Sequence, residues 1–222
     1  MSLKSWRSDP SKPAGTSYNR IAGQSIERLA ALSDGVFAIA LTLLVLDLHT
    51  PASSAIRSER DLCSALAAMS PSFVAYLMSF ITLGIFWNGQ QAQLSRLERG
   101  HRHLSWIHIA FLFAVSIMPF STRLLAEFIR YRTALVLYWG NILLLGVVLF
   151  ASWRYALRAG LVGPETPEDV RKAVERRIVA GQGLYALGAA LCVVNTYVSI
   201  GFIILVQLNF AIAPKIRFLS RI

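Results

Sequence analysis

The stretch RLAALSDGVFAIALTLLVLDLHTP, residues 28–51, predicts a membrane-spanning helix, yet it carries Ser33 and Asp34 early in its apolar run. A helix needs about 20 largely apolar residues to cross a hydrocarbon layer of roughly 30 Å, and the run 29–48 meets that length. An acid at the centre of such a helix costs about 2.5–3.5 kcal/mol on insertion scales. We therefore expect Asp34 to face neighbouring helices rather than lipid.

Composition gives the fold class, an all-α integral membrane protein. The chain has 222 residues, of which 55% are hydrophobic and 15% charged, and a mean hydropathy of +0.52. Further apolar runs cover 72–89, 104–120, 134–153 and 181–214. Pro119 and Arg123 mark the expected end of the third run, and the last run is long enough to divide near 195–199. The prediction is six transmembrane helices in one domain, 25–218, between a flexible cytoplasmic tail, 1–24, and a short cytoplasmic end, 219–222.

Positive charge predicts the orientation. Most of the 22 Lys and Arg residues lie in segments 1–28, 96–102, 154–177 and 215–221, which six spans place on the same side as both termini. The other side keeps Arg57, Arg60, Arg123, Arg130 and Arg132. Because cytoplasmic segments accumulate basic residues, we expect a multi-pass protein of the cell (plasma) membrane with both termini cytoplasmic. Anionic inner-leaflet lipid then accounts for the net charge of +10, and nucleic acid is not an expected partner.

Three local patterns have structural interpretations. The segment GPETPEDVRKAVERR, 163–177, predicts a charged cytoplasmic loop with Pro164 and Pro167 before a helical turn. Small residues at 181–190 predict close helix packing. Trp87, Trp106, Trp139 and Trp153 lie near predicted helix ends, where we expect indoles at the level of the lipid headgroups.

No pattern indicates an enzyme. Cys63 and Cys192 have no disulfide or metal spacing, the four histidines form no HExxH, and neither GxSxG nor GxxxxGK[ST] occurs. We therefore expect no catalytic residues and no cofactor.

A helical wheel gives the first helix two different faces. With Ile39 as zero, Leu32, Gly35, Leu43 and Leu46 fall within roughly 40° and Thr42 within about 60°. Ser33 and Asp34 lie about 120° and 140° away, on opposite sides. The helix thus presents one nearly pure aliphatic stripe from which the acid points away.

The residues also resemble a known family. Arg28 followed by Leu32-Ser33-Asp34 resembles the R-x-x-x-F-S-D first-helix signature of potassium channels related to lysosomal transmembrane protein 175, in their single-repeat prokaryotic form. The resemblance continues through AYLMSFITLGIFW, 75–87, and FLFAVSIMPFST, 111–122. It is weaker at Tyr138 and WRYA, 153–156, and fades after the fourth helix.

The sequence departs from the family pattern in three respects, at four positions. Leu32 stands where the family usually has Phe, Gln90 and Gln91 where it usually has a His pair, and His108 where Asn is common. The last two exchanges keep hydrogen-bonding ability and look compensatory.

The resemblance implies a potassium-permeable cation channel, a homotetramer in which four copies of the first helix line a central pore without a TVGYG loop. Ile39, Thr42 and Leu46 would face the axis, with Leu43 beside them. Potassium would be the permeant ion, bound only transiently, and no other metal is expected. Arg28, Ser33, Asp34, Trp87 and His108 would form a network near the cytoplasmic end.

Two other classes stay open from the residues. In a small proton-coupled secondary transporter, Asp34 would be the proton or substrate site, although intramembrane charges are sparse and no inverted repeat is evident. In a scaffold protein, the stripe would be only an interface.

Overall fold

The computed structural model describes residues 25–212. The predicted tail, 1–24, and the C-terminal end, 219–222, lie outside the described residues. The first helix, α2 (Ile26–Val45), begins at its N-cap Ser25, whose hydroxyl accepts a hydrogen bond from the Arg28 backbone N–H at 3.2 Å. It ends three residues earlier than the apolar run, because Leu46 and Asp47 form a turn.

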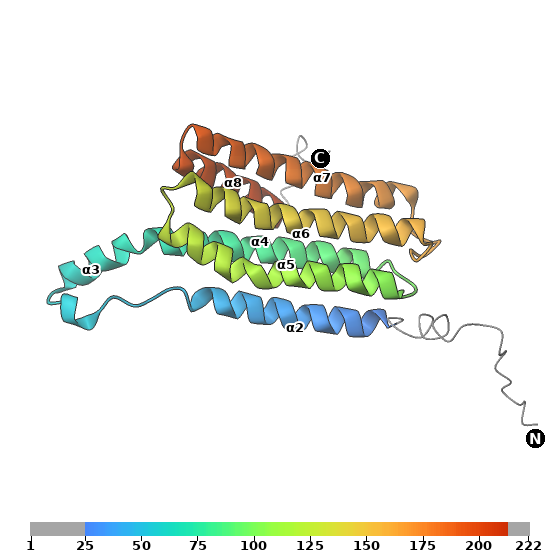
Figure 1. The fold of residues 1–222 in the computed structure, drawn as a ribbon, viewed down its shortest axis with the longest axis horizontal. Coiled ribbons are helices and arrows are strands. Elements are labelled where there is room, and N and C mark those ends of the chain that lie inside the picture. The colour runs from blue at the N-terminus through green and yellow to red at the C-terminus, as the bar shows by residue number, and fades with distance from the viewer. Residues whose placement is uncertain (1–24, 213–222) are drawn as a thin grey trace, which may run out of the picture.

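Three long helices follow: α4 (Ser70–Leu94), α5 (Arg102–Glu127) and α6 (Arg132–Arg158). Together with α2 they are the helices of the described residues that are long and apolar enough to cross a membrane. This confirms the all-helical fold, and four of the predicted runs form helices long and apolar enough to cross a membrane. Figure 1 shows α2 along one edge of the bundle and α7 (Glu168–Ala190) along the opposite edge. Between them, α2 packs on α4 and α5, and α6 packs on α5 and α7.

One predicted boundary was wrong, and one short helix was not predicted. The third run was expected to end at residue 120, but α5 continues through Pro119 to Glu127. A proline inside a helix removes one backbone hydrogen bond but does not force the helix to stop when neighbouring helices support it. The short helix α3 (Glu59–Ala68), which projects beyond the bundle in Figure 1, was not predicted.

The segment 163–177 is not mainly a loop, which corrects the prediction made for it. Helix α7 begins at Glu168. Its first ten residues, 168–177, therefore belong to the charged segment that was expected to be a loop ending in a helical turn. Pro167 at the N-cap and acidic Glu168 and Asp169 in the first turn are ordinary helix-start signals. Lys172 pairs with Glu168 one turn away and lowers the pKa of that carboxyl.

The predicted division of the last apolar run is confirmed. Helix α7 ends at Ala190, a 3-10 turn spans Leu191–Val193, and α8 (Thr196–Ile212) returns beside α7. A methyl group on Gly188 would lie 2.8 Å from Ile203 Cγ1, so only glycine allows this approach. The Ser199 hydroxyl donates to the Gly188 carbonyl across the hairpin.

A chain of buried polar side chains ties α8 to the centre of the bundle. Gln207 Nε2 donates to Thr82 Oγ1 at 2.6 Å, and the Ser79 hydroxyl donates to the Tyr138 hydroxyl at 3.2 Å. Thr122 of α5 donates to Ser79 at 2.7 Å. In a membrane interior such groups are satisfied by one another, so the chain fixes the register of α4, α5, α6 and α8.

Candidate pore helix and its polar network

Helix α2 leaves its predicted stripe uncovered. The exposed fractions of Leu32, Leu43, Ile39 and Leu46 are 49%, 43%, 60% and 68%. On the opposite face Phe37 and Leu44 are buried against the bundle, at 1% and 0%. The single chain therefore anchors α2 by one face and presents an aliphatic surface on the other.

Thr42 lies on the exposed side of α2 and places an oxygen among these aliphatic groups. Its hydroxyl donates to the Ile39 carbonyl at 2.8 Å, one turn earlier. Since the only hydroxyl proton is used within the helix, the lone pairs of Oγ1 stay available to a cation or to water.

Asp34 accepts two hydrogen bonds from α4. Its Oδ1 receives Trp87 Nε1 at 2.8 Å and Gln91 Nε2 at 2.7 Å. Trp87 and Gln91 are one turn apart, so they meet the carboxylate from one face of α4. The carboxylate is a brace between α2 and α4, although its residue is exposed in the single chain.

Ser33, on the buried side of α2, meets a second polar group. Ser33 Oγ lies 2.7 Å from His108 Nε2 of α5 and donates to the Leu29 carbonyl at 2.8 Å. Gln90 Nε2 lies 2.7 Å from the same His108 nitrogen and 3.3 Å from Ser33 Oγ. Because all three residues are nearly fully buried, this cluster joins α2, α4 and α5 away from solvent.

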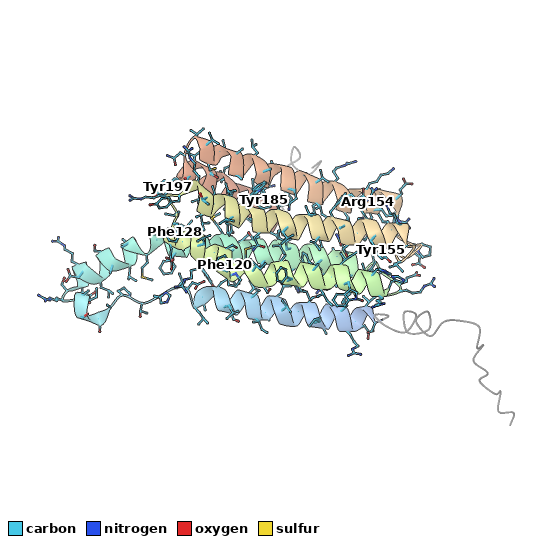
Figure 2. The ribbon with its side chains drawn as sticks, in the orientation of Figure 1. Phe120, Phe128, Arg154, Tyr155, Tyr185 and Tyr197 are labelled. Atoms are coloured by element: carbon cyan, nitrogen blue, oxygen red, sulfur yellow. The ribbon has the colours of Figure 1, made fainter. Side chains whose placement is uncertain are left out.

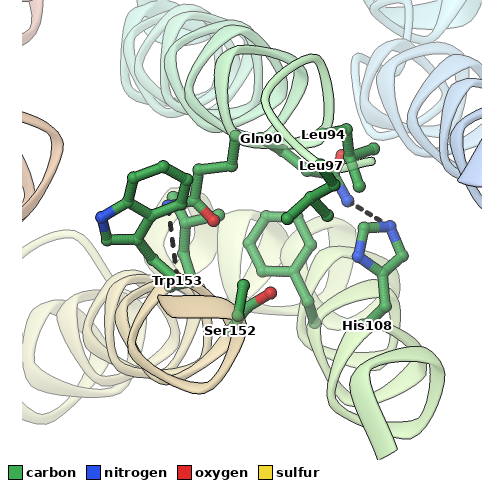
Figure 3. Close-up of a pocket in the computed structure, with 10 residues that line it drawn as sticks. Gln90, Leu94, Leu97, His108, Ser152 and Trp153 are labelled. Carbon is green, nitrogen blue, oxygen red and sulfur yellow. Dashed lines mark hydrogen bonds between the residues drawn. The ribbon is translucent and has the colours of Figure 1, made fainter. Parts of the chain in front are cut away.

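A small cavity lies behind this cluster, between α4, α5 and α6 (Figure 3). Its volume is about 10 Å³, close to the space of a single water molecule. Gln90 and His108 line one side, and Ser152 and Trp153 of α6 line the other. The buried Gln90 Oε1 has no hydrogen-bond partner among the described residues.

The structure brings four of the five predicted network residues into two neighbouring groups: Ser33 with His108, and Asp34 with Trp87. It does not bring Arg28 to them. Arg28 is exposed, and its side chain takes part in none of the ion pairs among the described residues. On the helical wheel Arg28 lies about 20° from Ile39, at the base of the aliphatic stripe.

Sequence reasoning noted Gln90 and Gln91 as departures and did not identify them as partners of His108 and Asp34. The available signal was spacing, since Gln91 follows Trp87 by four residues and Gln90 follows it by three. Trp153 also differs from expectation: its side chain is buried, and its Nε1 donates to the Arg171 carbonyl rather than facing lipid headgroups.

Metal ligands do not gather in this part of the molecule. Among residues 25–212 no three His, Cys, Asp or Glu side chains are grouped as a metal site would need.

Comparison with known proteins places this geometry in a family. Residues 28–119 match the model of the family described as "Endosomal/lysosomal potassium channel TMEM175". A potassium channel of Chamaesiphon minutus is 31% identical over 189 residues, covering 83% of this chain and 93% of that protein. A potassium channel of Streptomyces collinus is 32% identical over 173 residues, covering 76% and 82%.

A solved structure agrees over most of the fold. The crystal structure of a lysosomal potassium-selective channel TMEM175 homologue from Chamaesiphon minutus superposes with a TM-score of 0.75 at 29% identity. The superposition covers 86% of this chain and 98% of that one. Because a relative is 31% identical over 83% of this chain and the fold matches a solved TMEM175 homologue, the chain belongs to the TMEM175 family.

Proposed function

We propose that this protein is a potassium-permeable cation channel in which four subunits surround a central pore lined by α2. The observation that carries the proposal is the uncovered aliphatic stripe of α2, whose other face is anchored in the bundle. Two similar proteins named potassium channels and a solved structure described as potassium-selective support potassium as the permeant ion.

The pore would close by shape and by dewetting. Rings of four Ile39 and four Leu46 side chains narrow the lumen and expel water, because aliphatic surfaces hold it poorly. Between them, four Thr42 oxygens whose protons are engaged by Ile39 carbonyls offer lone pairs to a partly dehydrated cation. Leu43 would lie beside this path, toward the contact between neighbouring subunits.

Six spans per subunit complete the proposal, with α7 and α8 as the fifth and sixth. The 17 residues of α8 reach about 25 Å at 1.5 Å per residue, slightly less than the hydrocarbon thickness. The charged first half of α7 would stand in the cytoplasm and its small-residue half in the membrane. The basic residues of 96–102 and 154–177 then share the cytoplasmic side with both termini, in the cell membrane.

The geometry of Asp34 favours a channel over a proton-coupled transporter. A carboxylate that serves as a transport site must exchange its partners, whereas Asp34 Oδ1 is held by two donors on one rigid helix. That arrangement suits a fixed contact between the pore helix and α4.

Single-channel recording in planar bilayers tests the proposal with two matched variants of α2. Ile39→Asn should wet the constriction, raise basal cation current and weaken discrimination between potassium and sodium. Val45→Asn is the control, because Val45 is similarly exposed, at 47%, but lies about 120° from Ile39.

Unitary currents in the wild type, changed by Ile39→Asn and not by Val45→Asn, would support the proposal. Slow saturable flux without unitary steps would indicate a transporter instead. If both variants assemble and conduct alike, the stripe is only a packing face.

A further inference from the structure

A second and larger cavity lies far from α2, between α4, α6, α7 and α8. Its volume of about 280 Å³ is near the lower end of the range for small-molecule sites. The wall is mainly apolar and includes Phe86, Leu149, Ile178, Phe210 and Tyr185. Nothing in the proposed pore uses this space.

Two glycines leave the cavity wide. A methyl group on Gly89 of α4 would lie 3.6 Å from Leu149, and one on Gly181 of α7 would lie 3.5 Å from Phe210. Both distances are ordinary contacts, so the backbone does not require glycine at either position. Both glycines line the cavity, and a larger side chain at either position would occupy part of it.

One cation lines this apolar space. Arg177 is exposed, and its guanidinium carbon lies 5.7 Å from the centroid of the Phe210 ring, within the range of a cation–π contact. Among the described residues Arg177 belongs to no ion pair, whereas nearby Arg154 pairs with Glu175 at 3.2 Å. The Phe210 ring therefore holds an uncompensated positive charge at the cavity.

The polar and apolar parts are arranged along α7. Arg177 and Tyr185 are eight residues apart, about 12 Å along the helix axis. Tyr185 lies toward the middle of the bundle, and Arg154 lies near the end away from α3 (Figure 2). The cavity thus extends along α7 from the cationic Arg177 to Tyr185 and the apolar side chains around it.

We propose that this cavity binds an anionic phospholipid, with its phosphate at Arg177 and an acyl chain among Phe86, Leu149 and Phe210. Guanidinium is well suited to phosphate, and basic pockets between helices on the cytoplasmic side are a known arrangement for anionic headgroups. The choice of the cytoplasmic leaflet rests on the proposed topology, but the binding site itself does not depend on ion conduction.

The test is native mass spectrometry of the purified protein titrated with phosphatidylglycerol, with phosphatidylcholine as the neutral lipid. Arg177→Gln should weaken phosphatidylglycerol binding roughly fivefold, as expected for one basic residue at a membrane surface. Arg176→Gln is the matched control, since Arg176 is adjacent and exposed but does not line the cavity. Ala92→Phe, at an exposed residue of the cavity wall, should exclude the acyl chain.

Selective loss in Arg177→Gln and Ala92→Phe, with Arg176→Gln unchanged, supports the site. Equal loss in both arginine variants means diffuse attraction, and equal binding of the neutral lipid removes the role of charge; either result overturns the proposal. If Ala92→Phe dissociates the oligomer and leaves lipid binding intact, the cavity is a subunit contact. Lipid binding that persists in a protein without potassium flux would refute the proposed function and leave this site standing.

Discussion

Replacing Asp34 by alanine tests whether the acid braces α2 or handles ions. The change removes the acceptor of two hydrogen bonds, from Trp87 Nε1 at 2.8 Å and Gln91 Nε2 at 2.7 Å, and strands both donors. Hydrogen bonds between membrane helices contribute about 0.6 kcal/mol on average and up to about 1.7. Two such bonds give a loss of roughly 1–3 kcal/mol in the free energy of unfolding.

The measurement is thermal unfolding of the purified protein in detergent, followed by tryptophan fluorescence and by size-exclusion chromatography. A change of 1 kcal/mol shifts Tm by about 2–4 °C in a chain of this size, so Asp34→Ala should lower Tm by roughly 2–12 °C. Asp34→Asn keeps one carbonyl oxygen as acceptor and should lose less. Trp87→Phe in a double-mutant cycle with Asp34→Ala should be less than additive, because both changes remove the same bond.

The opposite pattern would refute the bracing role. If Asp34→Ala keeps the wild-type Tm and oligomeric state but abolishes potassium flux, the carboxylate acts on the permeant ion or on protons. Full additivity of Asp34→Ala and Trp87→Phe would show that the 2.8 Å contact contributes nothing to stability.

Three further outcomes are expected. Thr42→Val keeps the side-chain shape but would remove the ring of four oxygens of the proposed pore. The potassium-to-sodium permeability ratio, measured from reversal potentials, should then fall about fivefold, equivalent to about 1 kcal/mol; an unchanged ratio would exclude coordination by Thr42. Gly188→Val forces a side chain into Ile203 and should lower the free energy of unfolding by about 1–3 kcal/mol in thermal unfolding. Gly183→Val, with no atom within 4 Å of the added carbon, should lower it far less. Equal losses of stability in the two variants would contradict the close approach of α7 and α8. The exposed Cys63 should react with an impermeant thiol reagent added outside cells. In a Cys63→Ser background, Glu165→Cys should react with the same reagent only after the cells are permeabilised. The reverse labelling would show that the proposed topology is inverted.

Hydrophobic runs predicted the core of the fold because membrane helices must satisfy every backbone hydrogen bond internally. That constraint located α2, α4, α5 and α6 and the break before Thr196. It could not locate the start of α7, because seven of its first ten residues are charged and the segment is not an apolar run. It also could not show that α5 passes through Pro119, since neighbouring helices decide whether a proline ends a helix.

The candidate site also has one part that the sequence predicts and another that depends on how the helices pack. One-dimensional periodicity was sufficient to put Ile39 and Leu46 on one face and Asp34 off it, because the wheel depends only on helical geometry. The pairing of Gln90 with His108 depends on how α4 and α5 are rotated against each other, which no single helix specifies. Arg28 shows the limit of a motif, since its position matches the family signature while its exposed side chain belongs to none of the ion pairs among residues 25–212.

Pro119 lies inside α5 and makes this helix easier to bend at that point. Before the proline, His108 Nε2 lies 2.7 Å from Ser33 Oγ of α2; after it, the Thr122 hydroxyl donates to Ser79 of α4, also at 2.7 Å. The ring nitrogen of proline cannot donate a hydrogen bond to the carbonyl four residues earlier. We therefore expect α5 to bend most easily near Pro119, between these two contacts. If α2 tilts, the half of α5 that contacts Ser33 can follow it by bending at Pro119. The half after Pro119 would stay in place through the Thr122–Ser79 hydrogen bond.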